Sequence, residues 1–154
     1  MKRKELEVIL WSIALPGFGQ ILNHQIFKGT LFISLEFLIN VQSNFNQAIM
    51  YSFLGEIQKA IEVTNYQGLL FYPCLYMFAI WDAYKETGRV TSLYTFMPFV
   101  FSAYFVTVGL MYSSNLKIFG VLFGPVFLPM LFLIPGISIG LLIKILLGNL
   151  KVQK

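Results

Sequence analysis

The chain has 154 residues, of which 57% are hydrophobic, 17% aromatic and only 12% charged, and its mean hydropathy is +0.73. A water-soluble domain usually carries about 25% charged residues, so this composition lacks the polar surface that water requires and indicates a lipid environment. The formal net charge is +4, but the Lys and Arg residues flank apolar runs instead of clustering, which argues against a nucleic-acid partner.

The first apolar run, Val8 to Leu22, is interrupted by Pro16, Gly17 and Gly19. As a helix it would reach about 22 Å, less than the roughly 30 Å of a bilayer core. Proline removes a helical hydrogen-bond donor, and the glycines permit a bend. We therefore expect either a short, kinked span or a broken half-helix that returns to the side on which it began.

The second apolar run predicts a spanning helix over residues 26–47 that carries Glu36. This carboxylate lies about ten residues into the helix, roughly 15 Å deep and close to the bilayer centre. Asn40 follows it at helical spacing, so one face of the helix is polar. Two interpretations remain: a site that responds to protons or cations, or a neutral side chain that holds two helices together by hydrogen bonding.

Residues 45–66 have an amphipathic pattern. Apolar side chains recur every four residues, at Phe45, Ile49, Phe53, Ile57 and Ile61, and polar residues lie between them. This spacing predicts a helix on the membrane surface or packed over the bundle. A helix that docks on a specific partner is the alternative.

Three further spans are expected, over residues 68–84, 93–112 and 118–147. The last segment is too long for one straight span and contains several prolines, so we expect an irregular start and then a helix kinked near Pro135 and Gly136. The predicted fold is one all-α membrane domain, residues 1–154. It has about four full spans, a broken amino-terminal half-helix and one amphipathic surface helix.

The basic residues predict the orientation. If residues 8–22 crossed the membrane fully, Lys85, Arg89 and the lysines near the carboxyl terminus would lie outside, against the positive-inside bias. If the half-helix returns instead, only Lys59 and Lys117 lie outside. We therefore expect a multi-pass protein of the cell membrane with both termini in the cytoplasm.

Three polar residues are candidates for a site at the membrane edge: Asp82, Lys28 and His24. Asp82 ends a predicted span and is expected to pair with Lys85 or with the region of Lys28 and His24. Such a pair either pins the broken arm to the later span or is an ordinary interfacial contact worth about 0–1 kcal/mol. His24 is the single histidine and Cys74 the single cysteine, which excludes a multi-histidine or cysteine-based metal framework within one chain.

Signals for catalysis are weak. A Ser-His-Asp site would need Ser12, His24 and Asp82 without any nucleophile-elbow motif, and neither a phosphate-binding loop nor an HExxH motif occurs. We expect no enzyme activity and no cofactor. The glycine pairs Gly120/Gly124 and Gly136/Gly140 have the small-xxx-small spacing of close helix contacts, within one chain or between two.

Three short motifs in the first half of the chain carry a resemblance to a known family. They are Pro16-Gly17-Phe18-Gly19-Gln20, Lys28-Gly29 and Trp81-Asp82-Ala83-Tyr84. In these the chain resembles small bacterial membrane proteins related to the TM2 domain. The stretch from Ser43 to Tyr66 and the two carboxyl-terminal spans have no counterpart in that group. The resemblance implies a non-enzymatic integral membrane module and supplies no catalytic residue.

Two classes of function therefore remain. The first is an accessory or structural protein whose partners are the lipid bilayer and other membrane proteins or a second copy of itself. The second is a small transporter or channel subunit that uses Glu36 in a polar site at the bilayer midplane. A related possibility is an immunity-type protein that protects the cell from a membrane-active peptide.

Overall fold

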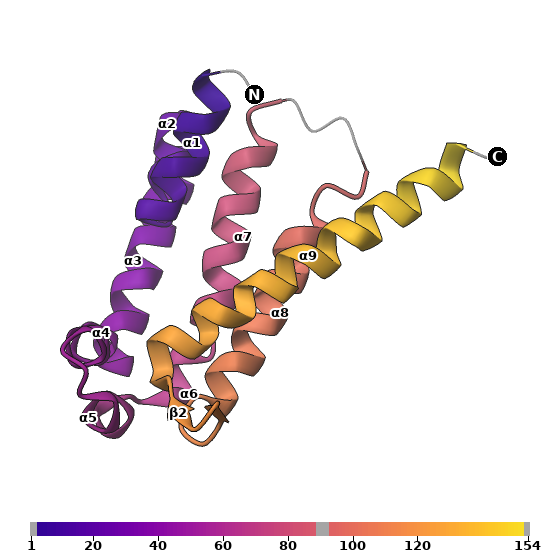
Figure 1. The fold of residues 1–154 in the computed structure, drawn as a ribbon. Coiled ribbons are helices and arrows are strands. Elements are labelled where there is room, and N and C mark those ends of the chain that lie inside the picture. The colour runs from indigo at the N-terminus through magenta and orange to yellow at the C-terminus, as the bar shows by residue number, and fades with distance from the viewer. Residues whose placement is uncertain (1–2, 89–92, 153–154) are drawn as a thin grey trace.

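A computed structural model describes residues 3–88 and 93–152, and these are mostly helical (Figure 1). The elements in chain order are α1 (Arg3–Ala14), α2 (Phe18–Leu22), α3 (Ile26–Ser43), α4 (Phe45–Phe53), α5 (Ile57–Val63), α6 (Tyr66–Leu69), α7 (Tyr72–Lys85), α8 (Met97–Tyr112), β1 (Lys117–Ile118), β2 (Val121–Leu122) and α9 (Gly124–Val152). The predicted all-α class is confirmed, with one small antiparallel β-hairpin in the described part of the chain.

The amino-terminal segment is a helical hairpin. Helix α1 ends at Ala14, and Gly17 adopts a left-handed φ of 106° before α2 begins. The start of α1, the start of α3 and the end of α7 all lie at the same end of the molecule (Figure 1). The helix therefore breaks at Pro16 and Gly17, and the chain turns back on itself.

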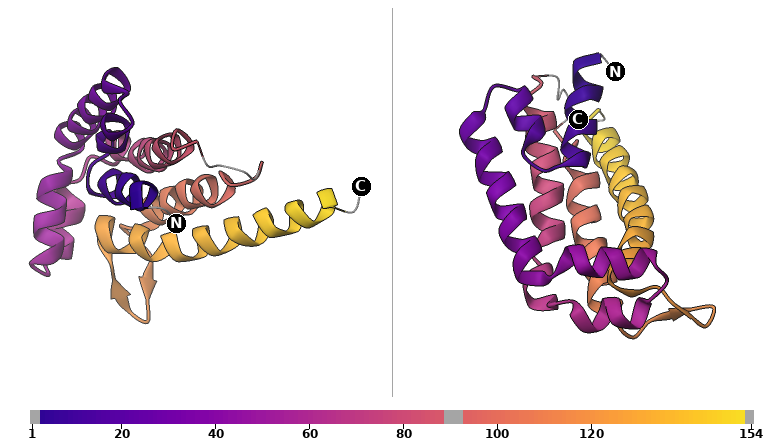
Figure 2. Two further views of the ribbon diagram at one scale, coloured as in Figure 1. Left: turned by 90° about the horizontal axis from the view of Figure 1, so that it is seen from above. Right: turned by 90° about the vertical axis from the view of Figure 1, so that its left-hand side faces the viewer.

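Helix α7 lies at the centre of the bundle. It packs against α3 on one side and α8 on the other, and α9 runs along α8 (Figure 2). The α1–α2 hairpin also packs on α7. Many of the buried side chains are small, including Ala79, Ala83, Ser102 and Ser113, although larger ones such as Leu128 are also buried. Small residues allow helix backbones to approach closely at these contacts.

The predicted helix over residues 26–47 is shorter than expected. Helix α3 ends at Ser43, and Asn44 takes a left-handed φ of 54° that turns the chain into α4. Asn65 satisfies the end of α3, because its backbone N–H donates to the Ser43 carbonyl at 3.0 Å and its side-chain amide donates to the Gln42 carbonyl at 3.2 Å. This tertiary cap ends the helix where the apolar pattern alone would have continued it.

The single amphipathic helix predicted over residues 45–66 is also wrong. Two helices, α4 and α5, replace it, and the chain reverses between them at Gly55, whose φ is 79°. They lie across one end of the bundle (Figure 2, right). Their buried positions are the small residues Ala48, Ser52 and Ala60, whereas Phe53 of the apolar stripe is exposed.

The expectation of about four membrane-length helices is corrected. Within the described residues, only α9 is both long and apolar enough to cross a membrane. Helix α7 has 14 residues and α8 has 16, so they rise about 21 Å and 24 Å. Helix α3 is longer, but it includes Lys28, Glu36 and the two amides Asn40 and Gln42. Turns and capping residues occupy the ends of the runs that the hydropathy pattern counted as helix.

The irregular start predicted for residues 118–147 is instead a hairpin followed by a continuous helix. Strands β1 and β2 pair through a two-residue turn in which Phe119 and Gly120 both have positive φ. Helix α9 then begins at Gly124 and continues through Pro129 and Pro135. Pro135 and Gly136 therefore lie inside one unbroken helix.

Candidate functional site at the amino-terminal hairpin

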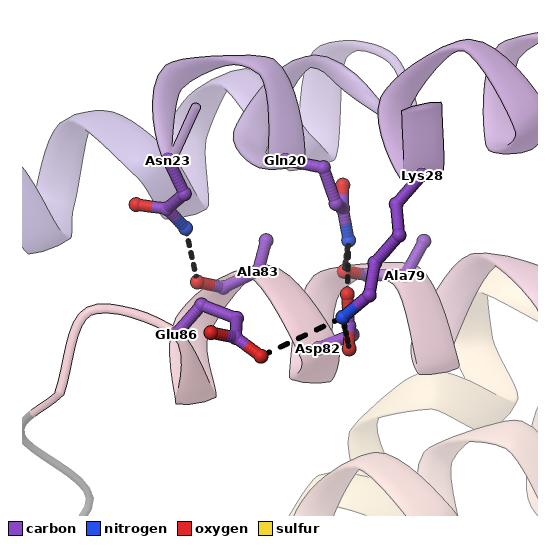
Figure 3. A network of polar contacts seen from close by, with 7 residues as sticks. All are labelled: Gln20, Asn23, Lys28, Ala79, Asp82, Ala83 and Glu86. Atoms are coloured by element: carbon purple, nitrogen blue, oxygen red, sulfur yellow. Dashed lines mark hydrogen bonds and ion pairs between the residues drawn. The ribbon is translucent and has the colours of Figure 1, made fainter. Parts of the chain in front are cut away.

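A polar cluster joins the α1–α2 hairpin, the start of α3 and the end of α7 (Figure 3). The side-chain amide of Gln20 donates to the carbonyl of Ala79 at 2.8 Å and to Oδ2 of Asp82 at 3.1 Å. Nζ of Lys28 lies 3.2 Å from Oδ1 of the same carboxylate. Asn23 donates to the carbonyl of Ala83 at 2.7 Å. We call Gln20, Asn23, Lys28 and Asp82 the hairpin clamp.

Two glycine contacts bring the backbones close enough for this clamp to form. A Cβ atom added at Gly29 would lie 2.5 Å from Cγ1 of Ile21 and 2.8 Å from the carbonyl oxygen of Gly17, so the close approach of α2 and α3 requires that position 29 has no side chain. A Cβ added at Gly19 would lie 2.7 Å from Cβ of Ala83 and would also collide with the hydroxyl of Ser12. Larger residues at these positions would separate the hairpin from α3 and α7.

The charges of the clamp are unequally exposed. The Asp82 side chain is 14% exposed and that of Lys28 is 44% exposed. Lys28 also reaches Glu86, whose carboxylate is 3.5 Å away and 38% exposed. Asp82 was predicted to pair either with Lys85 or with the region of Lys28 and His24, and in the structure it pairs with Lys28. The prediction that included His24 in this contact is not met, because that side chain is exposed in the turn before α3.

Glu36 forms a second polar contact, between α3 and α7. The hydroxyl of Tyr72 donates to its Oε1 at 3.2 Å. Its Oε2 atom is buried and has no hydrogen-bond partner among the residues that the structure describes. One turn along α7, the hydroxyl of Tyr76 donates to the carbonyl of Ile13, which lies near the end of α1. These tyrosines donate hydrogen bonds to a carboxylate and to a carbonyl near a helix terminus, two kinds of group that are costly to bury without a partner.

Asn40 does not belong to the Glu36 contact. Its side-chain amide nitrogen donates to Oδ1 of Asn46 at 3.1 Å, and its side-chain oxygen Oδ1 accepts from the backbone N–H of Asn46 at 3.3 Å. These bonds hold α4 against the end of α3. A polar face defined by helical spacing therefore serves two separate contacts, because α3 ends three residues after Asn40.

Gly136 is a packing residue in the contact between α9 and α8. A Cβ added there would lie 2.8 Å from Cα of Ser102, and one added at Gly140 would lie 2.5 Å from Cα of Pro98. The small-xxx-small pair Gly136/Gly140 therefore makes a contact within one chain. At Gly120 an added Cβ would meet nothing within 4 Å, whereas one at Gly124 would lie 2.8 Å from Cγ2 of Ile57, so only Gly124 of the pair Gly120/Gly124 is at a close contact.

A groove runs along the face of α7 opposite the hairpin, between α3 and α8, and has a volume of about 1360 Å³. We call it the α7 groove. Its lining on α7 extends from Phe71 to Trp81 and includes Cys74 and Phe78, which are exposed. Glu36 is not one of its lining residues. The groove and the Glu36 contact are therefore separate features of α3 and α7.

Ser12, His24 and Asp82 do not form a catalytic arrangement. The hydroxyl of Ser12 is buried and donates to the Val8 carbonyl at 2.8 Å, while Asp82 is engaged by Gln20 and Lys28. Among the described residues, no group of three His, Cys, Asp or Glu side chains is placed to hold a metal ion.

The comparisons with known proteins add no relative: no protein-family model, curated protein or solved structure matches this chain. The sequence reasoning named Lys28 and Asp82 but missed Gln20 and Asn23 as contact residues. The signal for Gln20 was present, since an amide follows Gly19 directly at a helix break. Tyr72 and Tyr76 had no such signal, because tyrosine is common in apolar segments near a membrane interface.

Proposed function

We propose that this protein is a multi-pass membrane protein with a non-enzymatic accessory role, and that it acts by binding other components of the bilayer. The polarity of its surface carries the proposal. Large apolar side chains are exposed over the bundle, with Phe27 at 83% and Phe71 at 71%, whereas Ser12, Gln20 and Ser43 are fully buried. Exposed apolar area on this scale is stable in lipid and unstable in water.

In this proposal α9 is the one described helix of membrane-crossing length, and the shorter helices α3, α7 and α8 lie in the bilayer beside it. The short helices have further helical turns next to them in the chain, since only two residues lie between the end of α6 and the start of α7. The α1–α2 hairpin enters from the end that holds Lys28 and Lys85, while Lys59 and Lys117 belong to the opposite end (Figure 1). The positive-inside bias supports both termini being cytoplasmic.

The resemblance to the TM2-domain group remains a proposal, and the hairpin clamp supports it. Each of the three motifs that carry the resemblance contributes a residue: Gln20, Lys28 and Asp82. In our proposal the clamp holds the α1–α2 hairpin in the cytoplasmic leaflet, against α3 and α7, and so fixes the surface that the bundle presents to its partners.

The first experiment separates a membrane protein from a peripheral or soluble one. The full chain is expressed, and its membranes are washed with alkaline carbonate. We expect the protein to stay in the pellet and to be released only by detergent. Recovery of monodisperse protein in buffer without amphiphile would overturn the proposal.

A second candidate function is a small transporter or channel subunit, favoured by the unpartnered Oε2 of Glu36. Intramembrane carboxylates often belong to ion or proton pathways. In sealed vesicles, a transporter that uses Glu36 should show pH-dependent flux that Glu36→Gln abolishes. Tyr72→Phe, which removes the hydroxyl and keeps the carboxylate, is the matched variant. Equal flux in wild type and Glu36→Gln would exclude this function and leave the accessory role.

A further inference from the structure

The α7 groove has a polar end and an apolar length. The amide side chains of Gln42 and Gln67 line the end near α4 and α6, and both are exposed. Away from this end the lining is apolar and includes Phe71, Phe78 and Val100. The aromatic rings of Trp81 and its neighbours on α8 line the opposite end. This gradient along one groove matches an amphiphile more closely than a uniformly apolar molecule.

The groove is longer than one leaflet of a bilayer and runs along most of α7. From Gly68 to Trp81 the helical rise is about 20 Å, and half of a hydrocarbon core is about 15 Å. The volume of about 1360 Å³ also exceeds the roughly 300–1,000 Å³ typical of sites for drug-sized ligands.

The charge of the lining selects among lipids. Every described residue that lines the groove is uncharged, so an anionic headgroup would find no cation to pair with among them. Amide groups donate and accept hydrogen bonds, which suits hydroxyl and ester oxygens. We infer that the α7 groove binds one diacylglycerol-type lipid with an uncharged, hydroxyl-bearing headgroup, placed at Gln42 and Gln67 with its acyl chains along α7. This inference rests on the proposed membrane function and names the component that is bound.

The two native tryptophans allow a direct test. Trp81 lines the groove, whereas Trp11 is exposed on α1, outside it. In the Trp11→Phe variant the tryptophan fluorescence comes from Trp81, and in the Trp81→Phe variant it comes from Trp11. Each is reconstituted in phosphatidylglycerol vesicles, and either a glycosyl-diacylglycerol or phosphatidylglycerol, brominated near the ends of its acyl chains, is then added as a fluorescence quencher.

We expect half-quenching of Trp81 at about a tenfold lower mole fraction of the glycosyl lipid than of phosphatidylglycerol, the preference that two ordinary hydrogen bonds confer. Trp11 should not distinguish the two lipids. Gln42→Ala with Gln67→Ala should abolish the preference at Trp81. Gln47→Ala, which removes an exposed amide outside the groove, should keep it.

Three other outcomes would overturn the inference or its basis. Equal quenching of Trp81 by both lipids would mean that the groove holds only unselected bilayer lipid. Protection of Trp81 from both lipids that is lost on dilution of the protein would assign the groove to a second copy of the chain. Absence of quenching at both tryptophans would instead contradict the proposed membrane function itself.

Discussion

At the scale of single residues, the molecule depends on places where side chains are absent or unusually small. The hairpin approaches α3 and α7 at Gly17, Gly19 and Gly29, and a buried amide then joins the helices by hydrogen bonds. In a bilayer the hydrophobic effect gives little drive for helix association, so close packing and hydrogen bonds must provide it. Two predictions follow from these two kinds of contact.

Gly19→Ala should destabilise the protein by about 1–3 kcal/mol, because the new Cβ would collide with the Ser12 hydroxyl and with Ala83. Equilibrium unfolding in mixed micelles measures the change. Gly148→Ala is the matched control, since an added Cβ there meets nothing within 4 Å in helix α9. It should be neutral or stabilising by up to about 1 kcal/mol. Equal effects of the two substitutions would contradict the packing argument.

Asp82→Ala should lower the free energy of unfolding by about 1–3 kcal/mol, because one N–H of the fully buried Gln20 amide would lose its acceptor. Glu86→Gln is the control. It weakens only the more exposed pair with Lys28, and it should change stability by about 0–1 kcal/mol. The same unfolding assay compares them, and a larger loss in Glu86→Gln would refute the assignment of Asp82 as the centre of the clamp.

At the scale of elements, α9 and α8 form a pair whose contact is made by glycines. Gly136 and Gly140 place the α9 backbone against the first half of α8, close to Ser102 and Pro98. This contact within one chain buries the small-residue surface through which two copies of the chain could otherwise associate. Association of copies through these glycines would first require α8 and α9 to separate.

Gly140→Leu is therefore expected to weaken the α8–α9 contact, with a loss of about 1–3 kcal/mol or more in mixed-micelle unfolding. Its Cβ alone would lie 2.8 Å from the Met97 carbonyl oxygen. Gly148→Leu adds the same side chain to open space on the same helix and should leave stability nearly unchanged. Native mass measurements in detergent should give the same oligomeric state for both variants. A change of state without a loss of stability would show that Gly140 faces another copy.

At the scale of the whole molecule, the two ends of the bundle differ. One end holds the start of α1, the start of α3 and the end of α7. The other end holds α4, α5, α6 and the β-hairpin (Figure 1). The exposed pair of Lys59 and Glu56 belongs to the second end, with Nζ and Oε2 2.7 Å apart, and this hydrogen bond raises the pKa of Lys59. In our proposal, this end faces the outside of the cell.

Cysteine accessibility tests that orientation. In a Cys74→Ser background, Lys117→Cys is expected to react with a membrane-impermeant maleimide on intact cells. Lys85→Cys should react only after the cells are permeabilised. Both positions are exposed, so burial does not explain a difference in labelling. Labelling of both residues from the same side would overturn the proposed topology.

Much of the fold was predictable, because the break at Pro16 and Gly17, the helical class and the contact between Lys28 and Asp82 arise from local chemistry. The break needs only a proline followed by glycines, and the ion pair needs two opposite charges at the ends of apolar runs. The end of α3 was not predictable in this way. Asn65 caps that helix from more than twenty residues away, and no local pattern contains such a contact.

The sequence by itself determined that apolar side chains cover the surface and where helices break, because composition and backbone preferences are properties of each residue. Only the tertiary structure decided which small residues meet, that Gln20 reaches Asp82, and that α3, α7 and α8 leave a groove between them. The reason is physical. Glycines and amides have no periodic signal, and their effect depends on which backbone comes within a few ångströms of them.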